Sequence, residues 1–363
     1  MTARRIVSIF ALALTLAMCA DAACECGFSL QTSNSTATFF THSIETDFLH
    51  ISSVAYSGIE GTPWQPQVWN QTAAQSRGAY GRSNLLENIV PNPLPGGTWS
   101  GPGARGGDPG LQLVVRKDLV DGMVTGAELA TSRTDILYGT FRVGMKVTGI
   151  NGTCSAFFWY RNDTQEIDVE YLSKNTSIVN TILQSGAAAA QGFDAAGTST
   201  YQKYDAGLSL SDEYHEYRYD WLPDRVDFYL DGLKISTYTE NVPDAPGHLL
   251  LSHWSNGNVG WSMGPPAEDA VSTISYVKAY FNVSGGDEVD VCSSGTAVCQ
   301  IPEQSGQPDL DGKPTFFFNP PPPQANSSTG MTIPTHASGA PQTWLTIFSR
   351  FAWMVVSLLL SIS

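Results

Sequence analysis

Short apolar runs alternate with turn-forming residues through the central part of the chain. The runs are rich in Val, Ile, Thr, Phe and Tyr, and Gly, Pro, Asn and Asp separate them, which is typical of β-strands joined by tight turns. The clearest runs are residues 111–115, 139–147, 155–160, 226–230 and 233–238. No long stretch shows the apolar period of an amphipathic helix, so we expect helices to be minor.

The dipeptide Asp231-Gly232 separates the last two of these runs and predicts a β-hairpin, because both residues tolerate the backbone of a two-residue turn. Many short strands with punctuating turns predict an all-β fold, an antiparallel two-sheet sandwich or jelly roll. We expect residues 23–283 to form this one domain, since sandwiches of this length commonly fold as a unit.

Both ends of the chain differ from this body. Residues 1–22 combine two arginines, an apolar run and a small-x-small pattern, which predicts a secretory signal peptide and disfavours a membrane anchor. Residues 284–343 hold nine prolines and predict an extended stalk. Residues 344–363 are apolar and follow a polar spacer, as in a GPI-attachment signal; a transmembrane helix is the alternative. The expected location is the cell surface or cell wall, with a GPI anchor in the plasma membrane.

Sequons and cysteines agree with passage through the secretory pathway. The Asn-x-Ser/Thr sequons are Asn34, Asn70, Asn151, Asn162, Asn175, Asn282 and Asn326. One of the six cysteines falls within the signal peptide, and most of the others should pair in an oxidising compartment. We expect Cys292 to bridge Cys299. Either Cys24 or Cys26 is expected to reach Cys154, which leaves one thiol unassigned.

Charge and motif spacing exclude several classes of function. The net charge is −15 and no Lys or Arg cluster offsets it, which argues against nucleic-acid binding. The six histidines show no metal-ligand spacing, so neither a metal nor a cofactor is expected. The string at residues 260–264 fits G-x-S-x-G, but two prolines follow where a nucleophile elbow must open a helix. Serine hydrolysis is therefore rejected.

The segment with the strongest chemical signal is Glu166-Ile167-Asp168-Val169-Glu170. Its polar and apolar residues alternate as in a strand, so the three carboxylates share one face. Neighbouring carboxylates cannot all ionise freely, so at least one pKa must be raised. A protonated acid beside an ionised carboxylate is what glycosidic cleavage requires. From spacing alone, an exposed acidic or calcium-binding strand remains the alternative.

Aromatic residues flank this segment. Residues 157–160 lie directly upstream, and Trp254 and Trp261 form a second group with polar neighbours. Aromatic rings stack on the apolar faces of sugars, so both groups are candidates for substrate binding, with core packing as the alternative for each.

The carboxylate segment, residues 166–170, resembles the active strand of glycoside hydrolase family 16, which reads E-x-D-x-E. Residues 138–146 resemble the family's YGxxxxxMK strand, and residues 215–232 resemble its FHxYxxxWxPDxxxFYxDG hairpin. With residues 251–254, the resemblance covers roughly residues 111–283 and is strongest to secreted or wall-anchored fungal members. It implies a concanavalin A-like jelly roll with a substrate cleft across its concave sheet.

The resemblance also implies roles for individual residues. Glu166 would be the nucleophile, Glu170 the general acid/base, and Asp168 the assisting residue in a retaining double displacement. The two Glu side chains would have to lean together, because retaining carboxyls lie about 5–5.5 Å apart. Thr164 and Gln165 depart from the family pattern before the first Glu, which leaves the linkage preference open. The aromatic residues expected at the sugar subsites are Phe158, Tyr160, Trp254 and Trp261.

Three functions follow from this resemblance. The first is an endo-β-glucanase acting on 1,3- or mixed 1,3/1,4-linked cell-wall β-glucan. The second is a wall transglycosylase that uses the same residues and passes the sugar to glucan or chitin. The third is a non-catalytic carbohydrate-binding protein, which the intact carboxylate trio disfavours. The expected partner is a polysaccharide and the expected state is a monomer.

Overall fold

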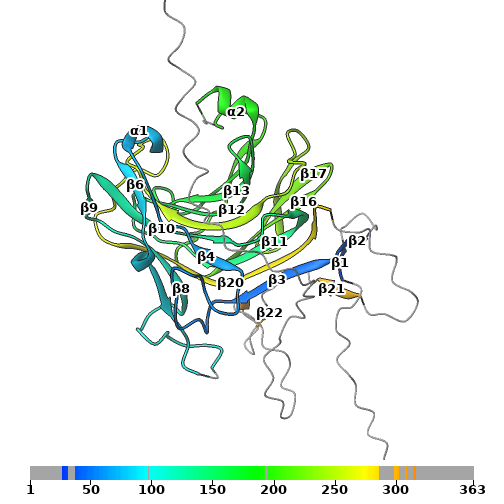
Figure 1. Cartoon of the computed structure of the whole chain (residues 1–363), viewed down its shortest axis with the longest axis horizontal. Coiled ribbons are helices and arrows are strands. Elements are labelled where there is room, and N and C mark those ends of the chain that lie inside the picture. Colours follow the sequence, from blue (N-terminus) through cyan, green and yellow to red (C-terminus); the bar gives the residue numbers. More distant parts are fainter. Residues whose placement is uncertain are drawn as a thin grey trace, which may run out of the picture. The chain divides into compact units, whose positions relative to one another are not determined.

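Two large β-sheets make up most of the computed structural model (Figure 1). The structure describes residues 27–31, 37–96, 98–192, 195–285, 298–301, 307–308 and 314–315. These residues belong to one unit, Met1–Pro320. The predicted signal peptide, most of the predicted stalk and the predicted C-terminal anchor signal lie outside them. The same holds for Asn34, Asn326, Cys24, Cys26 and Cys292.

The first sheet has ten strands in the order β15-β14-β13-β12-β19-β10-β6-β5, and β4 and β9 also pair with β10. All its pairs are antiparallel except β10 with β6. Its strands are β4 (Trp64–Pro66), β5 (Trp69–Gln71), β6 (Gly81–Asn84), β9 (Leu119–Val120), β10 (Met123–Thr131), β12 (Cys154–Asn162), β13 (Gln165–Leu172), β14 (Ile178–Gln184), β15 (Tyr201–Asp205) and β19 (His248–Trp254).

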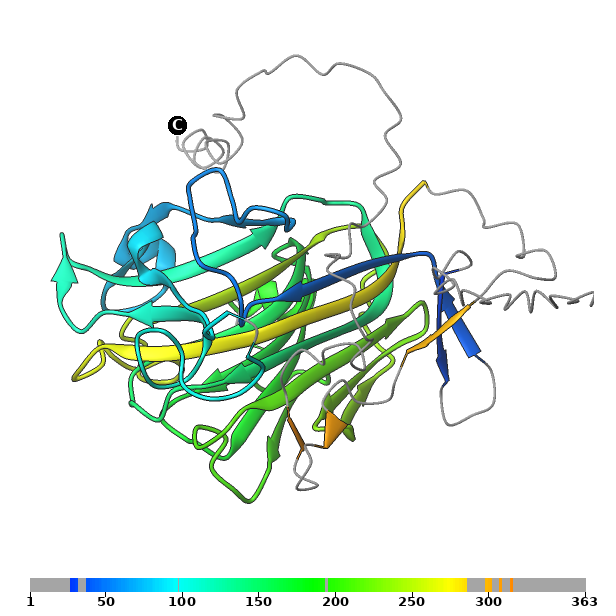
Figure 2. The same cartoon turned by 90° about the horizontal axis from the view of Figure 1, so that it is seen from below.

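The second sheet has eight strands in the order β18-β17-β16-β11-β20-β8-β7, with β3 also paired to β20. Figure 2 shows the long β20 running beside β3. Its strands are β3 (His42–Asp47), β7 (Ile89–Asn92), β8 (Gly110–Val115), β11 (Ile136–Lys146), β16 (His215–Leu222), β17 (Arg225–Leu230), β18 (Leu233–Tyr238) and β20 (Ala270–Val283).

Helices are minor in the described part of the chain, as the sequence predicts. They are α1 (Ala73–Ser76), α2 (Gly186–Ala190) and the 3₁₀ turn η1 (Leu86–Asn88). In Figure 1, α1 and α2 both lie above the ten-stranded sheet. The predicted all-β antiparallel sandwich is confirmed.

The core lies between the two large sheets. Ile167 and Val169 of β13 belong to it, as the alternation of that strand predicts. Aromatic pairs join the sheets: the ring centroids of Trp159 on β12 and Trp221 on β16 are 4.3 Å apart. Because successive strand residues point to opposite faces, burying Ile167 and Val169 sends the three carboxylates of β13 to the other face. We call this face of the ten-stranded sheet, which points away from the core, the outer face.

The predicted hairpin is confirmed between β17 and β18. Asp231 and Gly232 have φ values of 50° and 80°, and Leu230 pairs with Leu233 across the turn. Positive φ at both central residues is what a type I′ turn requires.

A three-stranded sheet packs against the domain. It contains β1 (Phe28–Gln31), β2 (Ala37–Phe40) and β21 (Cys299–Ile301), with β21 parallel to β1. Leu30, Phe40 and Ile301 form an apolar cluster with Leu222 and Tyr280 of the eight-stranded sheet. β21 falls within the segment that the sequence assigns to the stalk, so part of that segment belongs to a sheet. Strands β22 (Gln307–Pro308) and β23 (Pro314–Thr315) form a further short antiparallel pair.

The cysteines follow the prediction only in part. Cys299 is disulfide-bonded, and its bridge to Cys292 stays a prediction because its partner lies outside the described residues. The predicted bridge from Cys24 or Cys26 to Cys154 is wrong, because Cys154 is free and fully buried. It lies at the start of β12, and its buried side chain is beside Glu170 on the outer face.

No helix in the described residues is long and apolar enough to cross a membrane. Within the same ranges, no group of three or more His, Cys, Asp or Glu side chains is arranged to hold a metal ion.

Candidate active site

The three predicted carboxylates lie together on β13, which is not an edge strand of the ten-stranded sheet. β13 pairs with β12 on one side and β14 on the other. On β12, Tyr160 lies opposite Glu166, Phe158 opposite Asp168, and Ala156 opposite Glu170. The small side chain of Ala156 leaves room beside Glu170, whereas aromatic rings stand beside the other two carboxylates.

Burial raises the pKa of all three carboxyl groups. Asp168 is 5% exposed, whereas Glu166 and Glu170 are partly exposed. Desolvation, the largest cause, raises the pKa of Glu166 to about 8 and that of Glu170 to about 7. The pKa of Asp168 is raised well above its usual value, chiefly by burial and then by the charges of Glu166 and Glu170. The trio therefore carries fewer than three negative charges near neutral pH.

A hydrogen bond between Asp168 and Glu166 shifts the pKa values of both carboxyl groups. This bond lowers the pKa of Glu166 and raises that of Asp168, as expected when protonated Asp168 donates to ionised Glu166. The charge of Glu170 acts in the opposite direction and raises the pKa of Glu166. The higher pKa belongs to Glu166, so near neutral pH the free site holds the proton mainly on Glu166, and an attack by Glu166 requires the proton to pass to Glu170 when a sugar binds.

Trp261 contacts the catalytic candidate Glu170 directly. Its indole Nε1–H donates to Glu170 Oε2 at 2.8 Å, from the connection between β19 and β20. The sequence predicts Trp261 as a sugar-binding residue, and the structure adds this hydrogen bond to a carboxyl of the trio. The Trp261 ring also lies 6.0 Å from that of Tyr201, whose hydroxyl donates to Asn180 Oδ1.

Phe158, Tyr160 and Trp254 are brought to the same outer face by strand register. Trp254 of β19 lies opposite Cys154 of β12, and Tyr160 lies opposite His248 of β19. The Tyr160 hydroxyl donates to Asp163 Oδ1 at 2.8 Å, which ties the ring to the β12–β13 turn. Strand register thus brings these three aromatic residues to the face that carries the carboxylates, and their role in sugar binding stays a prediction.

Sequence reasoning missed a second polar cluster on the outer face, formed around Glu128 of β10. Glu128 is 8% exposed, and its Oε1 accepts a hydrogen bond from Trp69 Nε1 at 3.0 Å. Burial raises the pKa of Glu128, while the charge of Arg82 lowers it. Arg82 stacks against two indoles, with its guanidinium carbon 5.1 Å from Trp69 and 4.3 Å from Trp254.

One row of the sheet connects this cluster to the carboxylate trio. Glu170 lies opposite Ala156, Ala156 opposite Ser252, and Ser252 opposite Glu128. Three steps between neighbouring strands separate the two carboxylates by about 14 Å at Cα. The signal for Glu128 was present in the sequence, because it is the one charged residue in the otherwise uncharged strand of residues 123–131.

The sequons in the described part of the chain lie at its surface. Asn70, Asn151, Asn162 and Asn175 are exposed, and Asn282 is partly exposed. Asn162 is the one nearest the trio in sequence, and its Oδ1 accepts from the Thr164 backbone in the β12–β13 turn.

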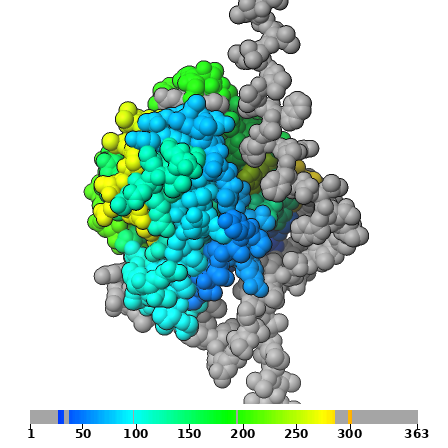
Figure 3. Space-filling model, turned by 60° about the vertical axis from the view of Figure 1, so that its left-hand side comes forward, coloured from blue at the N-terminus to red at the C-terminus, as the bar shows by residue number. Residues whose placement is uncertain are grey.

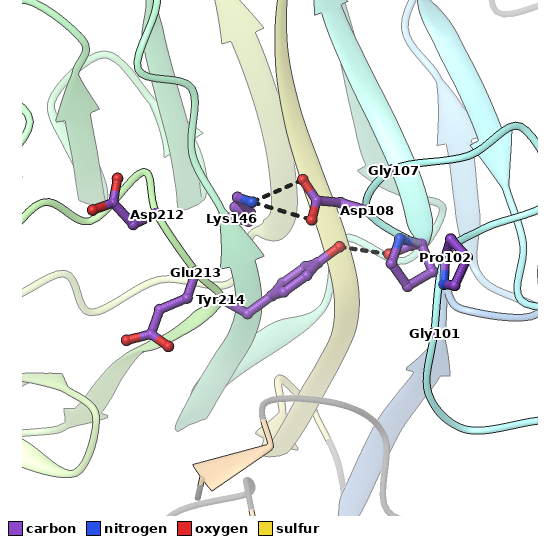
Figure 4. A pocket seen from close by; sticks show the side chains of 9 residues that line it. Gly101, Pro102, Gly107, Asp108, Lys146, Asp212, Glu213 and Tyr214 are labelled. Atoms are coloured by element: carbon purple, nitrogen blue, oxygen red, sulfur yellow. Dashed lines mark hydrogen bonds and ion pairs between the residues drawn. The ribbon is translucent and has the colours of Figure 1, made fainter.

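A cavity of about 390 Å³ lies away from the trio (Figure 4). Lys146 at the end of β11 forms an ion pair with Asp108 at its wall, and the Tyr214 hydroxyl donates to the Pro109 carbonyl. The acidic side chains of Asp212 and Glu213 also line it. None of the three β13 carboxylates contributes to this cavity, so it is separate from the candidate active site.

Comparison with known proteins agrees with the motif and the fold. Residues 98–278 match the model of Glycosyl hydrolases family 16. A beta-glucanase of Brevibacillus brevis is 31% identical over 134 residues, which cover 34% of this chain and 48% of the relative. A beta-glucanase of Acetivibrio thermocellus is 33% identical over 122 residues, which cover 32% of this chain and 34% of the relative. The matched segment thus spans about half or less of the length of these relatives.

A solved structure shares the fold. It is a prokaryotic beta-1,3-1,4-glucanase (lichenase) derived from a mouse hindgut metagenome, with 21% identity and a TM-score of 0.50. The superposition covers 66% of this chain and 99% of that one. The sandwich and the E-x-D-x-E strand at its outer face agree with the match of residues 98–278 to the model of Glycosyl hydrolases family 16.

Proposed function

We propose that this protein is a retaining glycoside hydrolase that cleaves internal bonds of the β-glucan polymer. The observation that carries the proposal is the row of three carboxyl groups on β13, all with raised pKa values and with Asp168 hydrogen-bonded to Glu166. A coupled acid and carboxylate on one strand face are the two groups that glycosidic cleavage needs. The family match and the beta-glucanase names of the relatives support the substrate class.

In the first step, Glu166 attacks the anomeric carbon while Glu170 protonates the glycosidic oxygen. The bond from the anomeric carbon to that oxygen breaks, and the leaving sugar departs with the proton of Glu170. A glycosyl ester forms on Glu166. Asp168 keeps its hydrogen bond to the Glu166 carboxyl and so stabilises its ionised form before attack.

In the second step, Glu170 is ionised and acts as a base. It takes a proton from water, whose oxygen attacks the anomeric carbon as the ester bond to Glu166 breaks. Two displacements at one carbon retain its configuration. This mechanism requires the two carboxyl groups to be about 5–5.5 Å apart when substrate is bound, which stays a prediction.

The cluster around Glu128 fits a sugar subsite beside the reacting bond. Trp69 and Trp254 supply aromatic rings, and Glu128 and Arg82 supply polar groups that can bind hydroxyls. The Nε–H of Arg82 is fully buried and has no hydrogen-bond partner among the described residues. Phe158 and Tyr160 extend the aromatic surface on the other side of the row.

The test compares the full chain with Glu166→Gln on β-1,3-glucan and on mixed-linkage β-1,3/1,4 oligosaccharides, with product lengths read by mass spectrometry. Shorter products that the variant does not form support the proposed hydrolase. Products longer than the input would instead assign a transglycosylase, in which an acceptor sugar replaces water. If neither protein changes the glycans while both bind them, the proposal fails and a carbohydrate-binding role remains.

A further inference from the structure

Glu170 has side-chain hydrogen-bond donors on two sides. The Trp261 indole donates to Oε2 at 2.8 Å from the β19–β20 connection, and the Cys154 thiol is hydrogen-bonded to the same carboxyl from the neighbouring strand β12. Neither donor belongs to the trio. Glu166 has a different partner, because its carboxyl is hydrogen-bonded to Asp168. The two catalytic candidates are therefore held by separate sets of contacts.

The loop that carries Trp261 is fixed at several points. Asn256 Nδ2 donates to the Ser76 carbonyl at the end of α1 at 2.6 Å, and the Asn256 carbonyl accepts from the Tyr80 amide at 2.9 Å. Lys174 Nζ donates to the Gly260 carbonyl at 2.5 Å. Figure 3 shows the yellow atoms of this part of the chain bordering the light-blue atoms around α1. The loop is thus anchored at Asn256 and at Gly260, next to Trp261, which restricts the orientation of the indole.

The loop is also stabilised internally. Ser262 Oγ donates to Asn256 Oδ1 at 2.9 Å, and Asn258 Oδ1 accepts from the Gly260 amide at 2.9 Å. Asn256 and Ser262 are both buried. A sugar platform needs only an exposed ring face, whereas a donor aimed at one oxygen needs this degree of positional control.

Cys154 reaches Glu170 through the strand register. Ala156 lies directly opposite Glu170, so Cys154 is its diagonal neighbour on the same face of the sheet. The thiol is unpaired and 0% exposed. Its proton has two acceptors, the Ser155 carbonyl at 3.9 Å and the Glu170 carboxylate, and the charged acceptor forms the stronger bond.

We propose that Trp261 and Cys154 are positioning residues that hold the Glu170 carboxyl in one orientation and favour transfer of its proton to the substrate. The inference rests on the proposed role of Glu170 as general acid/base. A donor to a carboxylate stabilises the ionised form, so both contacts offset the effect of burial on the Glu170 pKa. Without them Glu170 is a weaker acid in the first step, and its carboxyl is free to turn away from the glycosidic oxygen.

The test combines a direct titration with kinetics on the full chain. Glutamate labelled with ¹³C at the carboxyl carbon lets NMR report the pKa of Glu170, with Glu170→Gln used to assign the signal. Trp261→Phe keeps a ring and removes the N–H, and Trp99→Phe is the matched control because Trp99 packs on His50 instead. Cys154→Ala removes the thiol, whereas Cys154→Ser keeps a donor at the same position.

We expect Trp261→Phe to raise the Glu170 pKa by about one unit, which a lost hydrogen bond to a charged group produces. It should lower kcat about tenfold while KM stays within about twofold, because the lost contact acts on the reacting group. The alkaline limb of the kcat profile should move upward with the pKa. Cys154→Ala should give a smaller shift in the same direction, and Cys154→Ser and Trp99→Phe should give none.

Two results would overturn the inference. One is an unchanged Glu170 pKa in both Trp261→Phe and Cys154→Ala. The other is a Trp261→Phe variant with a large rise in KM and an unchanged kcat, which is the behaviour of a sugar platform. Because the titration needs no turnover, it separates the two proposals. If the wild type has no glycosidase activity but the variants still shift the Glu170 pKa, the proposed function is refuted, whereas the effect of Trp261 and Cys154 on Glu170 stands.

Discussion

Asp168 and Glu166, two residues apart on β13, share a hydrogen bond on the outer face of the ten-stranded sheet. Asp168 is the more deeply buried of the two and keeps its proton well above the usual pKa of an aspartate. A neutral donor in this place stabilises the charge that Glu166 needs for attack, without adding a second charge beside it. The same burial makes ionisation of Asp168 unfavourable, so the protonation state of Asp168 affects the free energy of unfolding.

Asp168→Asn should separate these two roles. Because the folded-state pKa of Asp168 is raised, its stabilising effect is fully present below its unfolded pKa of about 3.9 and is lost as the pH rises through the folded value. Asn has no proton to lose, so at pH 9 the variant should exceed the wild type in free energy of unfolding by about 1–3 kcal/mol. Urea unfolding at pH 5 and pH 9 measures the difference. An equal gain at both pH values would contradict this account.

Glu166 and Glu170 should respond differently to loss of their charge. Glu166→Gln removes the nucleophile and should lower kcat by about 10³-fold or more on every substrate. Glu170→Gln removes the proton donor, so its first step should recover on an aryl β-glucoside whose leaving group needs no protonation. Added azide should then restore turnover of the Glu170 variant and give a product of retained configuration. Recovery in the Glu166 variant, and not in the Glu170 variant, would reverse the two roles.

The parts of the site that the sequence predicts are those encoded within one strand. Alternation along residues 166–170 is enough to place Glu166, Asp168 and Glu170 on one face, since the strand period is local. Asp231-Gly232 predicts its hairpin for the same reason, because the two-residue turn is set by its own residues.

The cluster around Glu128 could not be predicted in this way. Trp69, Arg82 and Glu128 come from β5, β6 and β10, and only the register between those strands brings them together. The error at Cys154 has a similar origin. A count of cysteines in an oxidising compartment suggests pairing, but it does not show that this side chain is buried beside Glu170 on the outer face.

Glu128→Gln should affect binding more than chemistry. The Trp69 N–H keeps an acceptor in the amide oxygen, while the charge that faces Arg82 is lost. Arg82 then has less to hold it between the two indoles, so the subsite loses order. We expect KM to rise about tenfold with kcat changed less than about threefold. Initial-rate kinetics on mixed-linkage oligosaccharides measure both. A fall in kcat at unchanged KM would place Glu128 in the chemical step instead.

His253 should make the fold sensitive to acid. It is fully buried between the sheets, where its Nδ1–H donates to the Leu113 carbonyl of β8 at 2.8 Å. Its Nε2 therefore accepts from the Thr153 hydroxyl, at 2.9 Å. A second proton on the ring would remove this acceptor, and burial lowers the pKa of His253 to about 4.

Because the folded-state pKa is depressed, the contribution of His253 is present above its unfolded pKa of about 6.5 and is lost as the pH falls through about 4. The β13 carboxylates have the opposite sign: because their pKa values are raised, the fold loses stability as the pH rises from their unfolded pKa of about 4.3 through 7 to 8. The two effects oppose each other between about pH 4.3 and pH 6.5, and of these groups only the carboxylates act above pH 6.5, so the free energy of unfolding should fall between about pH 6.5 and pH 8. His253→Gln should be less stable than the wild type at pH 7 by about 2 kcal/mol, and this difference should shrink as the pH falls from 6.5 to 4. Urea unfolding of both proteins from pH 4 to pH 9 measures the difference, and a difference that stays constant below pH 6.5 would assign the acid sensitivity to another group.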